Sequence, residues 1–356
     1  MVRNKVTLHS SGATYAIGSA VLFGASTPLA KLLLGEGVDP WLLAGLLYFS
    51  SGLGLAVVMA TQGLLGIRKT EGPLQRADVP WLVCAILAGG VAGPILLMIG
   101  LAGTPASTAS LLLNLEGLAT MLIAWAVFHE NASIRIIVGA TAILAGAVLL
   151  SWQGELGAAR WSALAIAGAC IAWAIDNNLT RKISGGDPIQ IAMLKGLVAG
   201  TINLLLAVTN SAALHRLALV ADAALIGFLG YGVSLVLFVL ALRHLGAART
   251  GAYFAAAPFI GTLIAVTVLS EPITARLVVA AVLIAVGLWL HLTEHHLHRH
   301  RHRSEDHDHR HIHDLHHKHR HEQADPQGEP HTHRHMHKPA LHAHPHYPDM
   351  HHQHDH

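Results

Sequence analysis

The sequence contains few charged side chains. Asp, Glu, Lys and Arg together make up 12% of its 356 residues, against about 25% in an average soluble domain, which disfavours a soluble globular protein. The 23 basic and 21 acidic residues nearly balance and form no basic patch for nucleic acid. Only two cysteines occur, Cys84 and Cys170, and both lie in apolar runs outside any CxxC pair, so a disulfide framework is excluded.

Motifs that are typical of enzymes and nucleotide-driven proteins are absent as well. The chain has no P-loop, no GxSxG and no HExxH sequence, and the segments between its apolar runs are too short for a catalytic domain. The sequence therefore predicts that the protein is not an enzyme, and it excludes ATP coupling within this chain. No cofactor is expected to be required.

Long apolar runs, in contrast, fill most of the chain before Glu294. A helix crosses the roughly 30 Å hydrocarbon layer in about 20 residues. Because backbone groups in lipid must be bonded within the segment, runs of this length are expected to be helices. The first is too long for a cleavable signal peptide. The ten runs are residues 15–34, 41–65, 79–101, 108–128, 134–152, 161–179, 189–208, 223–242, 251–269 and 273–292.

The distribution of Lys and Arg predicts the orientation. Before Glu294, ten of the Lys and Arg residues outside the runs or near their ends lie on the side that holds the N-terminus, and three lie on the opposite side. Because Lys and Arg are enriched in cytoplasmic loops, both chain termini are expected in the cytoplasm. The expected location is a bacterial inner membrane, since the sequence carries no eukaryotic targeting signal.

The two halves of the apolar region are similar to each other. A shift of 141 residues gives eleven identities over the 34 positions 117–150, and these include Glu130 with Glu271 and Arg135 with Arg276. Each copy then holds five spans, and because five is odd the copies are expected to be inverted relative to each other. Inverted repeats are typical of secondary transporters, whose substrate site lies near the membrane midplane between the halves.

The end of each copy also resembles a known family. After His129 and Glu130 the first copy closes on ILAGAVLLSW, and the second reads TLIAVTVLSEPITARLVVAAVLIAVGLWL. Both segments resemble the end of an EamA domain of the drug/metabolite transporter superfamily. The resemblance covers essentially the whole membrane region and implies ten helices in two inverted five-helix repeats that carry small solutes. Two features depart from the pattern: Phe23-Gly24 replaces the usual Trp-Gly, and a His-rich tail follows the second copy.

These observations predict an all-α integral membrane protein in four segments. They are a cytoplasmic N-terminal segment (1–13), a first EamA-like repeat (14–152), a second EamA-like repeat (153–293) and a His-rich cytoplasmic tail (294–356). The tail holds 24 of the 29 histidines. It contains too little apolar surface to repay the entropy of ordering, so it is expected to be disordered.

Six polar residues fall well inside the predicted spans. A charge at the middle of the membrane costs about 2.5–3.5 kcal/mol, so the three charges among them are expected to face each other or a wet cavity. We interpret the set as a transit site, in which the carboxylates bind a cation or proton and the lysine supplies a counter-charge. A static network that holds the helices together is the alternative. The residues are Asn114, Glu116, Asp176, Asn177, Asn178 and Lys195.

Other residues mark helix ends. Glu130 and Glu271 each precede an Arg by five residues, and both are expected to act as caps or ion-pair partners at a helix turn. Pro28, Pro94 and Pro258 mark candidate breaks within spans, where freed carbonyls can line a path for the solute.

The tail is predicted to bind a divalent transition metal. Neutral imidazole suits nickel, cobalt, zinc and copper, and the lack of cysteine favours exchangeable binding over a rigid structural site. The candidate ligands are His291, Glu294, His295, His298, His300, His302, His307, His309, His311 and His313.

Three functions remain open at this point. The leading hypothesis is export of a divalent transition metal ion or metal chelate, with the tail as a cytoplasmic collector or sensor. The second is export of small organic metabolites such as amino acids, in which Lys195 meets a substrate carboxylate and the tail is regulatory. The third is a membrane-anchored metal store or sensor without transport. The expected partners are membrane lipid and a small solute or metal ion, and the sequence leaves open whether the chain forms a homodimer.

Overall fold

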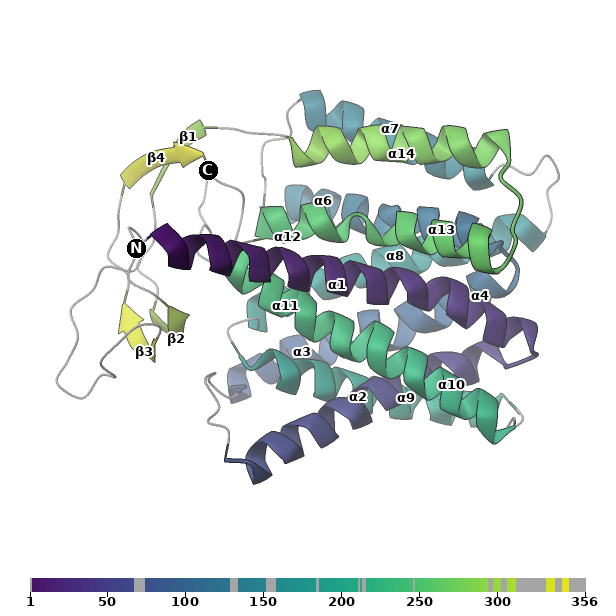
Figure 1. The fold of residues 1–356 in the computed structure, drawn as a ribbon, viewed down its shortest axis with the longest axis horizontal. Helices are drawn as coiled ribbons and strands as arrows, with labels where there is room; N and C mark the ends of the chain where they lie inside the picture. The colour runs from purple at the N-terminus through teal and green to yellow at the C-terminus, as the bar shows by residue number, and fades with distance from the viewer. Residues whose placement is uncertain are drawn as a thin grey trace.

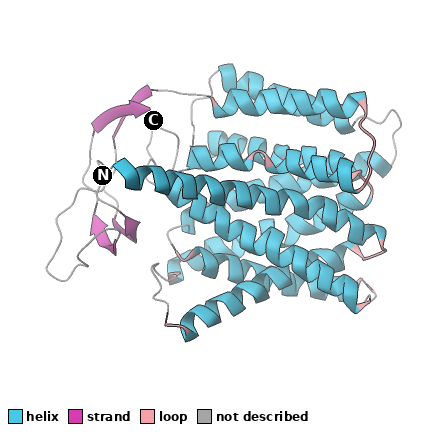
Figure 2. Cartoon of the chain, in the orientation of Figure 1, coloured by secondary structure: helices cyan, strands magenta, loops and turns pink. Residues whose placement is uncertain are grey.

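The computed structural model describes residues 2–66, 74–128, 134–151, 158–183, 186–210, 212, 216–245 and 247–293, and four short segments of the tail, 297–301, 306–311, 331–336 and 341–345. Between residues 2 and 293 these residues form a bundle of helices, and Figure 2 shows helix as its main component. α1 begins and α14 ends at the same end of the bundle (Figure 1).

The bundle is built from two runs of helices along the chain. The first run comprises α1 (Val2–Gly35), α2 (Pro40–Leu64), the short 3-10 helix η1 (Arg76–Asp78), α3 (Val79–Ala85), α4 (Gly93–Ala102), α5 (Ala106–Leu112), α6 (Asn114–Phe128) and α7 (Ile134–Ser151). The second comprises α8 (Ala158–Ile183), α9 (Pro188–Thr209), α10 (Leu217–Gly227), α11 (Ser234–Leu245), α12 (Ala247–Phe254), α13 (Ala257–Val268) and α14 (Ala275–Leu292).

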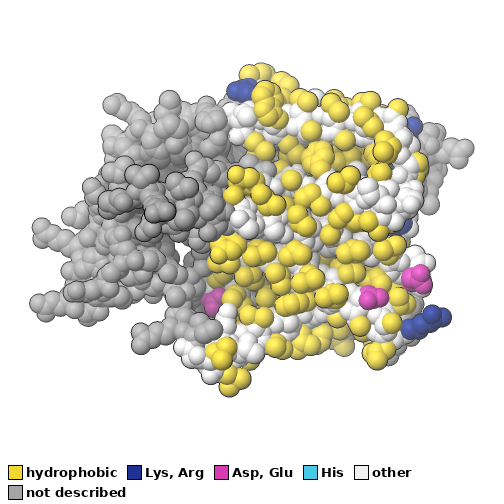
Figure 3. Space-filling view, viewed as in Figure 1, with side chains coloured by type: hydrophobic (Ala, Val, Ile, Leu, Met, Phe, Trp, Pro, Cys, Tyr) yellow, Lys and Arg dark blue, Asp and Glu magenta, His cyan; other side chains and the backbone are white. Residues whose placement is uncertain are grey.

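The surface and the lengths of these helices fit a membrane. In the described part of the chain, nine helical segments are long and apolar enough to cross one, and α13 is a shorter apolar helix of 12 residues. Large side chains such as Leu205, Leu225 and Leu263 are exposed, and Figure 3 shows hydrophobic side chains spread over the visible face of the bundle. Such a surface is stable in lipid, so the predicted multi-pass, helical membrane protein is confirmed. The ninth predicted span is divided between α12 and α13.

Local sequence signals explain where several helices begin. Asp39 and Asp187 precede α2 and α9, and each is followed by a proline at the first helical position. The carboxylate of Asp39 accepts a hydrogen bond from the backbone N–H of Trp41 at 2.9 Å, and Asp187 accepts one from Ile189 at 2.9 Å. Both helices therefore start with the N-cap chemistry that satisfies unpaired amides.

Glycines allow close contacts between the two runs of helices. A Cβ added to Gly196 on α9 would lie 2.6 Å from the backbone nitrogen of Gly52 on α2. A Cβ added to Gly287 on α14 would lie 2.6 Å from the carbonyl oxygen of Gly139 on α7. Small residues at such crossings let membrane helices pack backbone to backbone. The fully buried core, with Leu43, Leu97, Leu111 and Ile166, lies among α2, α4, α5 and α8.

Two of the spans contain a π-helical segment. η2 (Ile86–Ala92) joins α3 to α4, and η3 (Phe228–Val233) joins α10 to α11. A π-helical turn inserts an extra residue into the hydrogen-bond ladder of a helix and is often found at functional sites. In η2, the carbonyls of Gly89 and Gly90 accept hydrogen bonds from side chains of other helices.

Two further spans are broken. A turn at Leu113 separates α5 from α6, and Ala255 and Ala256 separate α12 from α13. α5 begins at Ala106 and α12 begins at Ala247, 141 positions later. This is the shift that relates the two halves of the sequence, and it carries Leu113 to Phe254, directly before Ala255, so the interruptions occur at nearly corresponding places.

Of the three prolines predicted to mark breaks, two lie directly after an interruption of a helix. Pro94 and Pro258 each occupy the second position of a helix, α4 and α13, directly after an interruption. Pro28 lies inside α1, which continues to Gly35. The prediction of a break at Pro28 is therefore wrong.

Glu271 caps a helix, as the sequence predicted. Its carboxylate accepts hydrogen bonds from the backbone N–H groups of Ala106 at 2.6 Å and Ser107 at 2.8 Å, the first two residues of α5. Glu130 lies outside the described residues.

The tail was predicted to be disordered, and the structure describes four short strands within it. β1 (Leu297–Arg301) pairs with β4 (Leu341–Pro345), and β2 (Asp306–His311) pairs with β3 (His331–Met336), each pair antiparallel. Histidines stand opposite histidines at two positions in the first pair and three in the second. These segments repeat histidine at every second residue, which is the period of a strand.

Candidate functional site

Asp176 on α8 and Lys195 on α9 form a buried ion pair. The ammonium nitrogen of Lys195 lies 2.6 Å and 2.7 Å from the two carboxylate oxygens of Asp176. The side chains are only 9% and 12% exposed. Thr180 donates a hydrogen bond to the same carboxylate at 2.8 Å and accepts one from Lys195 at 3.3 Å. Because each charge has a close partner, the pair can lie within the bundle.

The carboxylate of Asp176 lies against the π-helical segment η2. A Cβ added to Gly89 would overlap with that carboxylate, so only glycine fits here. The carbonyl of Gly89 accepts hydrogen bonds from the Tyr48 hydroxyl at 3.0 Å and the Trp173 indole at 2.8 Å. The carbonyl of Gly90 accepts one from Asn203 at 2.9 Å. Side chains from α2, α8 and α9 therefore satisfy the carbonyls that the π-helical turn frees.

A second carboxylate, Glu116, lies on the other side of α8. It occupies the first turn of α6, just after the break at Leu113, where the helix dipole favours a negative charge. The amide of Asn177 donates a hydrogen bond to Glu116 at 2.8 Å and contacts the Thr120 hydroxyl at 3.4 Å. In the described part of the chain, no ion pair involves Glu116.

The two asparagines that remain of the predicted set bond to backbone. The amide of Asn178 donates to the carbonyl of Ala174 at 2.8 Å and to that of Thr120 at 3.4 Å. The amide of Asn114 donates to the carbonyl of Leu111 at 2.9 Å and so bridges the break between α5 and α6. The predicted residues thus lie around α8: Asp176 and Lys195 on the α9 side, and Glu116, Asn177 and Asn178 on the α6 side.

A cluster of aromatic rings adjoins these polar groups, which sequence reasoning missed. Phe23 on α1 lies at its centre, with ring centroids 6.5 Å from Trp173, 6.0 Å from Tyr231 and 5.4 Å from Phe254. Tyr48 lies 5.4 Å from Tyr231, and Tyr48 also bonds to Gly89. We call these five residues the aromatic cluster. Apart from the Phe23-Gly24 departure, nothing in the sequence distinguished them from ordinary apolar packing.

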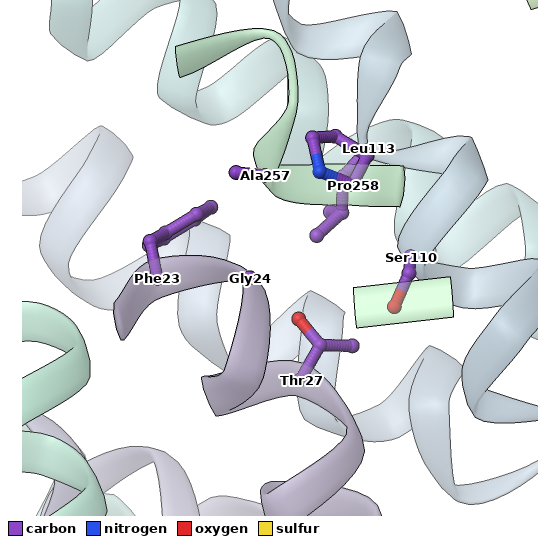
Figure 4. Close-up of a pocket in the computed structure, with 7 residues that line it drawn as sticks. All are labelled: Phe23, Gly24, Thr27, Ser110, Leu113, Ala257 and Pro258. Atoms are coloured by element: carbon purple, nitrogen blue, oxygen red, sulfur yellow. The ribbon is translucent and has the colours of Figure 1, made fainter. Parts of the chain in front are cut away.

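A small pocket lies on the other side of Phe23, between α1, α5 and α13 (Figure 4). It is too narrow to admit a water-sized molecule. The hydroxyl oxygen of Ser110 is buried there without a hydrogen-bond partner. The lining residues are Phe23, Gly24, Thr27, Ser110, Leu113, Ala257 and Pro258, so both runs of helices contribute to it.

The predicted metal ligands are only partly placed. Among the described residues, no group of three or more His, Cys, Asp or Glu side chains is arranged to hold a metal ion. A ring nitrogen of His291 lies 2.9 Å from the carbonyl oxygen of Ile136 on α7. His298 and His300 lie on β1, and His307, His309 and His311 lie on β2. Glu294, His295, His302 and His313 fall outside the described residues.

A multi-pass bundle with interrupted helices and ionisable groups in its interior is typical of a membrane transporter. The comparison with known families agrees, because the EamA-like transporter family matches residues 10–152 and again residues 160–293. The chain belongs to the EamA-like transporter family. Its members are transporters, so this protein moves a solute across a membrane and is not an enzyme.

Two known proteins show how far the similarity extends. An "Uncharacterized transporter" of Methanothermobacter thermautotrophicus is 26% identical over 291 residues, which cover 77% of this chain and 84% of that protein. A solved structure titled "Crystal structure of protein" is 19% identical, with a TM-score of 0.59, and covers 79% of this chain and 96% of that one. The second match supports the fold alone.

Proposed function

We propose that this protein is a secondary active exporter of a small organic zwitterion, such as an amino acid. One observation carries the proposal: α8 presents Asp176 to Lys195 on one side and Asn177 to Glu116 on the other. A basic group from α9 and an acidic group from α6 therefore lie next to the same turn of α8. A substrate carboxylate would replace Asp176 at Lys195, and Glu116 would receive the substrate ammonium.

The ammonium group of Lys195 favours a zwitterion over a bare cation. Removing one partner of a buried ion pair leaves an uncompensated charge, which costs about 3–5 kcal/mol. A zwitterion brings one charge of each sign, so Lys195 keeps an anionic partner and Glu116 gains a cationic one, while the carboxylate of Asp176 keeps the hydrogen bond from Thr180. A metal ion at the same place would approach the ammonium of Lys195 and be repelled by it. The faces of the aromatic cluster add a surface on which an ammonium group is stabilised.

The paired interruptions support alternating access between two inverted repeats. The interruption between α5 and α6 has its counterpart between α12 and α13, and η2 has its counterpart in η3. Broken helices at corresponding places in two halves are a feature of secondary transporters whose halves rock about a central site. We further propose that both termini are cytoplasmic, that the membrane is a bacterial inner membrane, and that the transport direction is outward.

Export of a divalent transition metal is the second candidate, and the tail favours it. The tail holds 24 of the chain's 29 histidines, and imidazole is a preferred ligand of nickel, cobalt, zinc and copper. In this case the tail would collect the ion and the oxygens of Glu116 and Asp176 would bind it in transit. A metal-storing protein without transport does not fit the family to which the chain belongs.

Transport by purified protein in liposomes tests the proposal. The probes are each proteinogenic amino acid in radiolabelled form and, separately, nickel, cobalt, zinc and copper with an internal metal dye. The variants are Glu116→Gln and Lys195→Met, each removing one charge of the site. Asp222→Asn is the matched control, because Asp222 is an exposed carboxylate on α10 outside the site.

The results separate the two candidates. We expect at least one amino acid to be transported, and both site variants to lose about 30-fold or more of that transport, since the loss of a charged hydrogen bond of about 2 kcal/mol corresponds to that factor. Asp222→Asn should keep it. Metal transport without amino acid transport, reduced when the chain ends after Glu294, would overturn the proposal in favour of the second candidate.

A further inference from the structure

At one end of the bundle, a single carboxylate joins the two EamA-like copies. Glu271, between α13 and α14, belongs to the second copy, whereas Ala106 and Ser107 belong to the first. One carboxylate oxygen accepts from the N–H of Ala106 at 2.6 Å and the other from the N–H of Ser107 at 2.8 Å. Hydrogen bonds to an ionised acceptor are about twice as strong as neutral ones. We call this the Glu271 end; the loop that carries it is visible between α13 and α14 in Figure 1.

The same corner of the first copy is bonded from two other helices. Thr262 on α13 donates a hydrogen bond to the carbonyl of Ser107 at 3.2 Å. Lys31 on α1 donates to the carbonyls of Leu101 at 2.7 Å and Ala102 at 3.0 Å, at the end of α4. Cations at the C-terminal end of a helix bind its unpaired carbonyls favourably. The connection from α4 to α5 is therefore fixed at its carbonyls by Lys31 and at its amides by Glu271.

The pocket lies directly behind this corner. Ser110, one turn along α5 from Ser107, has the unpartnered hydroxyl described above. A Cβ added to Gly261 on α13 would lie 2.6 Å from the Ser110 hydroxyl and 2.7 Å from the carbonyl of Gly24 on α1. α1, α5 and α13 therefore meet in one seam, and the pocket is the space that remains within it (Figure 4).

α5 is suited to move as a unit. It has only seven residues, and the turn at Leu113 separates it from α6 and Glu116. A few residues at the end of a helix are the usual hinge of a gate. Ala106, Ser107 and Ser110 on α5 are buried. Gly117 and Asn177, which lie next to the site, are exposed.

We propose that the seam of α1, α5 and α13 is the gate of the transport pathway at the Glu271 end, and that Glu271 is the positioning residue that holds it shut. In the closed state the carboxylate holds the amides of α5 against the second copy. When the carboxylate releases them, α5 swings about the turn at Leu113, and the pocket beside Ser110 opens to the aqueous side. The proposal rests on the transport function, but it does not depend on which solute is carried.

Labelling of a cysteine in the pocket tests the gate without any solute. The reporter is Ser110→Cys in the full chain with Cys84→Ser, because Cys84 is exposed and Cys170 is buried. Proteoliposomes of both orientations receive a membrane-impermeant maleimide, with and without Glu271→Gln. We expect Glu271→Gln to raise the labelling rate from the Glu271 end by about tenfold or more, the factor that corresponds to 1.4 kcal/mol, with no rise from the other end.

Asp39 is the matched control, because its carboxylate caps a helix of its own copy rather than of the other copy. Asp39 also accepts two backbone amides, those of Trp41 at 2.9 Å and Leu42 at 3.1 Å, at the start of α2. Asp39→Asn should leave the labelling of Ser110→Cys unchanged. An equal rise in both variants would show that Glu271 is merely a helix cap, and no rise with Glu271→Gln would overturn the gate.

Two further variants keep the test decisive if Glu271→Gln folds poorly. Lys31→Met frees the carbonyls of α4 and should raise the labelling in the same direction but by less. Thr27→Cys, on the α1 side of the pocket, replaces Ser110→Cys as the reporter. If labelling rises as expected while no amino acid is transported, the gate is supported and the proposed substrate is contradicted. If amino acids are transported without any rise in labelling, the proposed substrate is supported and the gate is contradicted.

Discussion

The two EamA-like copies share their backbone interruptions but differ in their chemistry. Position 116 is Glu in the first copy, and the position 141 residues later, Ala257, begins α13 without a charge. Asp176 of the second copy lies against Gly89 of η2 in the first, and Ser26 of the first copy lies against Gly230 of η3 in the second. Interruption of the helices therefore does not depend on buried charge. The charged residues lie around α8, where the second copy contacts the first, and the corresponding positions of the other copy carry no charge. This asymmetry argues for a functional role.

The largest effect should come from breaking the ion pair that only one copy has. Lys195→Met leaves the buried carboxylate of Asp176 without its cation, so the free energy of unfolding should fall by about 3–5 kcal/mol, and transport should be lost. Adding Asp176→Asn should restore most of the stability but no transport. Thermal unfolding in detergent, together with a liposome assay, measures both. A double variant no more stable than Lys195→Met would contradict the direct pairing.

Placing a carboxylate at the corresponding position of the other copy should also destabilise the protein. Ser26 is 1% exposed and donates its hydroxyl to the carbonyl of Phe23 at 2.6 Å. Ser26→Asp introduces a charge that lacks the counterpart of Lys195, and an unpaired charge at this depth costs about 2.5–3.5 kcal/mol. The same unfolding measurement, with Ser26→Asn as the uncharged control, checks it. Equal stability of the two variants would mean that this part of the bundle is solvated.

The paired glycines of the π-helical segments should give a smaller and more selective effect. A Cβ at Gly89 overlaps with the Asp176 carboxylate, and a Cβ at Gly230 lies 2.7 Å from that of Ser26. Gly89→Ala and Gly230→Ala should each lower the free energy of unfolding by about 1–3 kcal/mol through overpacking. Only Gly89→Ala should also reduce transport strongly, since it alone displaces a charge of the site.

Gly117→Ala is the control for this pair. An added Cβ at Gly117 meets no atom within 4 Å, so the substitution should be neutral or add up to about 1 kcal/mol of helix stability. Equal losses of transport in Gly89→Ala and Gly230→Ala would remove the functional difference between the copies.

The smallest effect is expected at the hydroxyl of Tyr48. Tyr48→Phe removes one of two hydrogen bonds to the carbonyl of Gly89, and the bond from Trp173 remains. The free energy of unfolding should fall by about 1 kcal/mol, and transport should stay within a few-fold of the original. A loss as large as that of Lys195→Met would instead place the Tyr48 hydroxyl in the pathway.

The sequence predicted the membrane spans and the repeat well, because both depend on local composition. The 141-residue shift, derived from pairs such as Glu130 with Glu271, also relates the start of α5 to the start of α12. The aromatic cluster and the acceptor carbonyl of Gly89 were not predictable in this way. A π-helical turn forms where neighbouring side chains satisfy its carbonyls, and those side chains come from helices far away in the chain.

The site was predicted as a set of residues but not as an arrangement. Hydropathy alone identified Glu116, Asp176 and Lys195 as charges within spans, since each interrupts an apolar run. The tertiary structure decided that Lys195 pairs with Asp176 and that Asn177 holds Glu116, because the rotation of α8 about its axis directs neighbouring side chains to different helices. It also brought Glu271 to the amides of α5. The sequence by itself determines which segments have the length and apolar composition to cross a membrane. The partners of each charge depend on how the helices pack against each other.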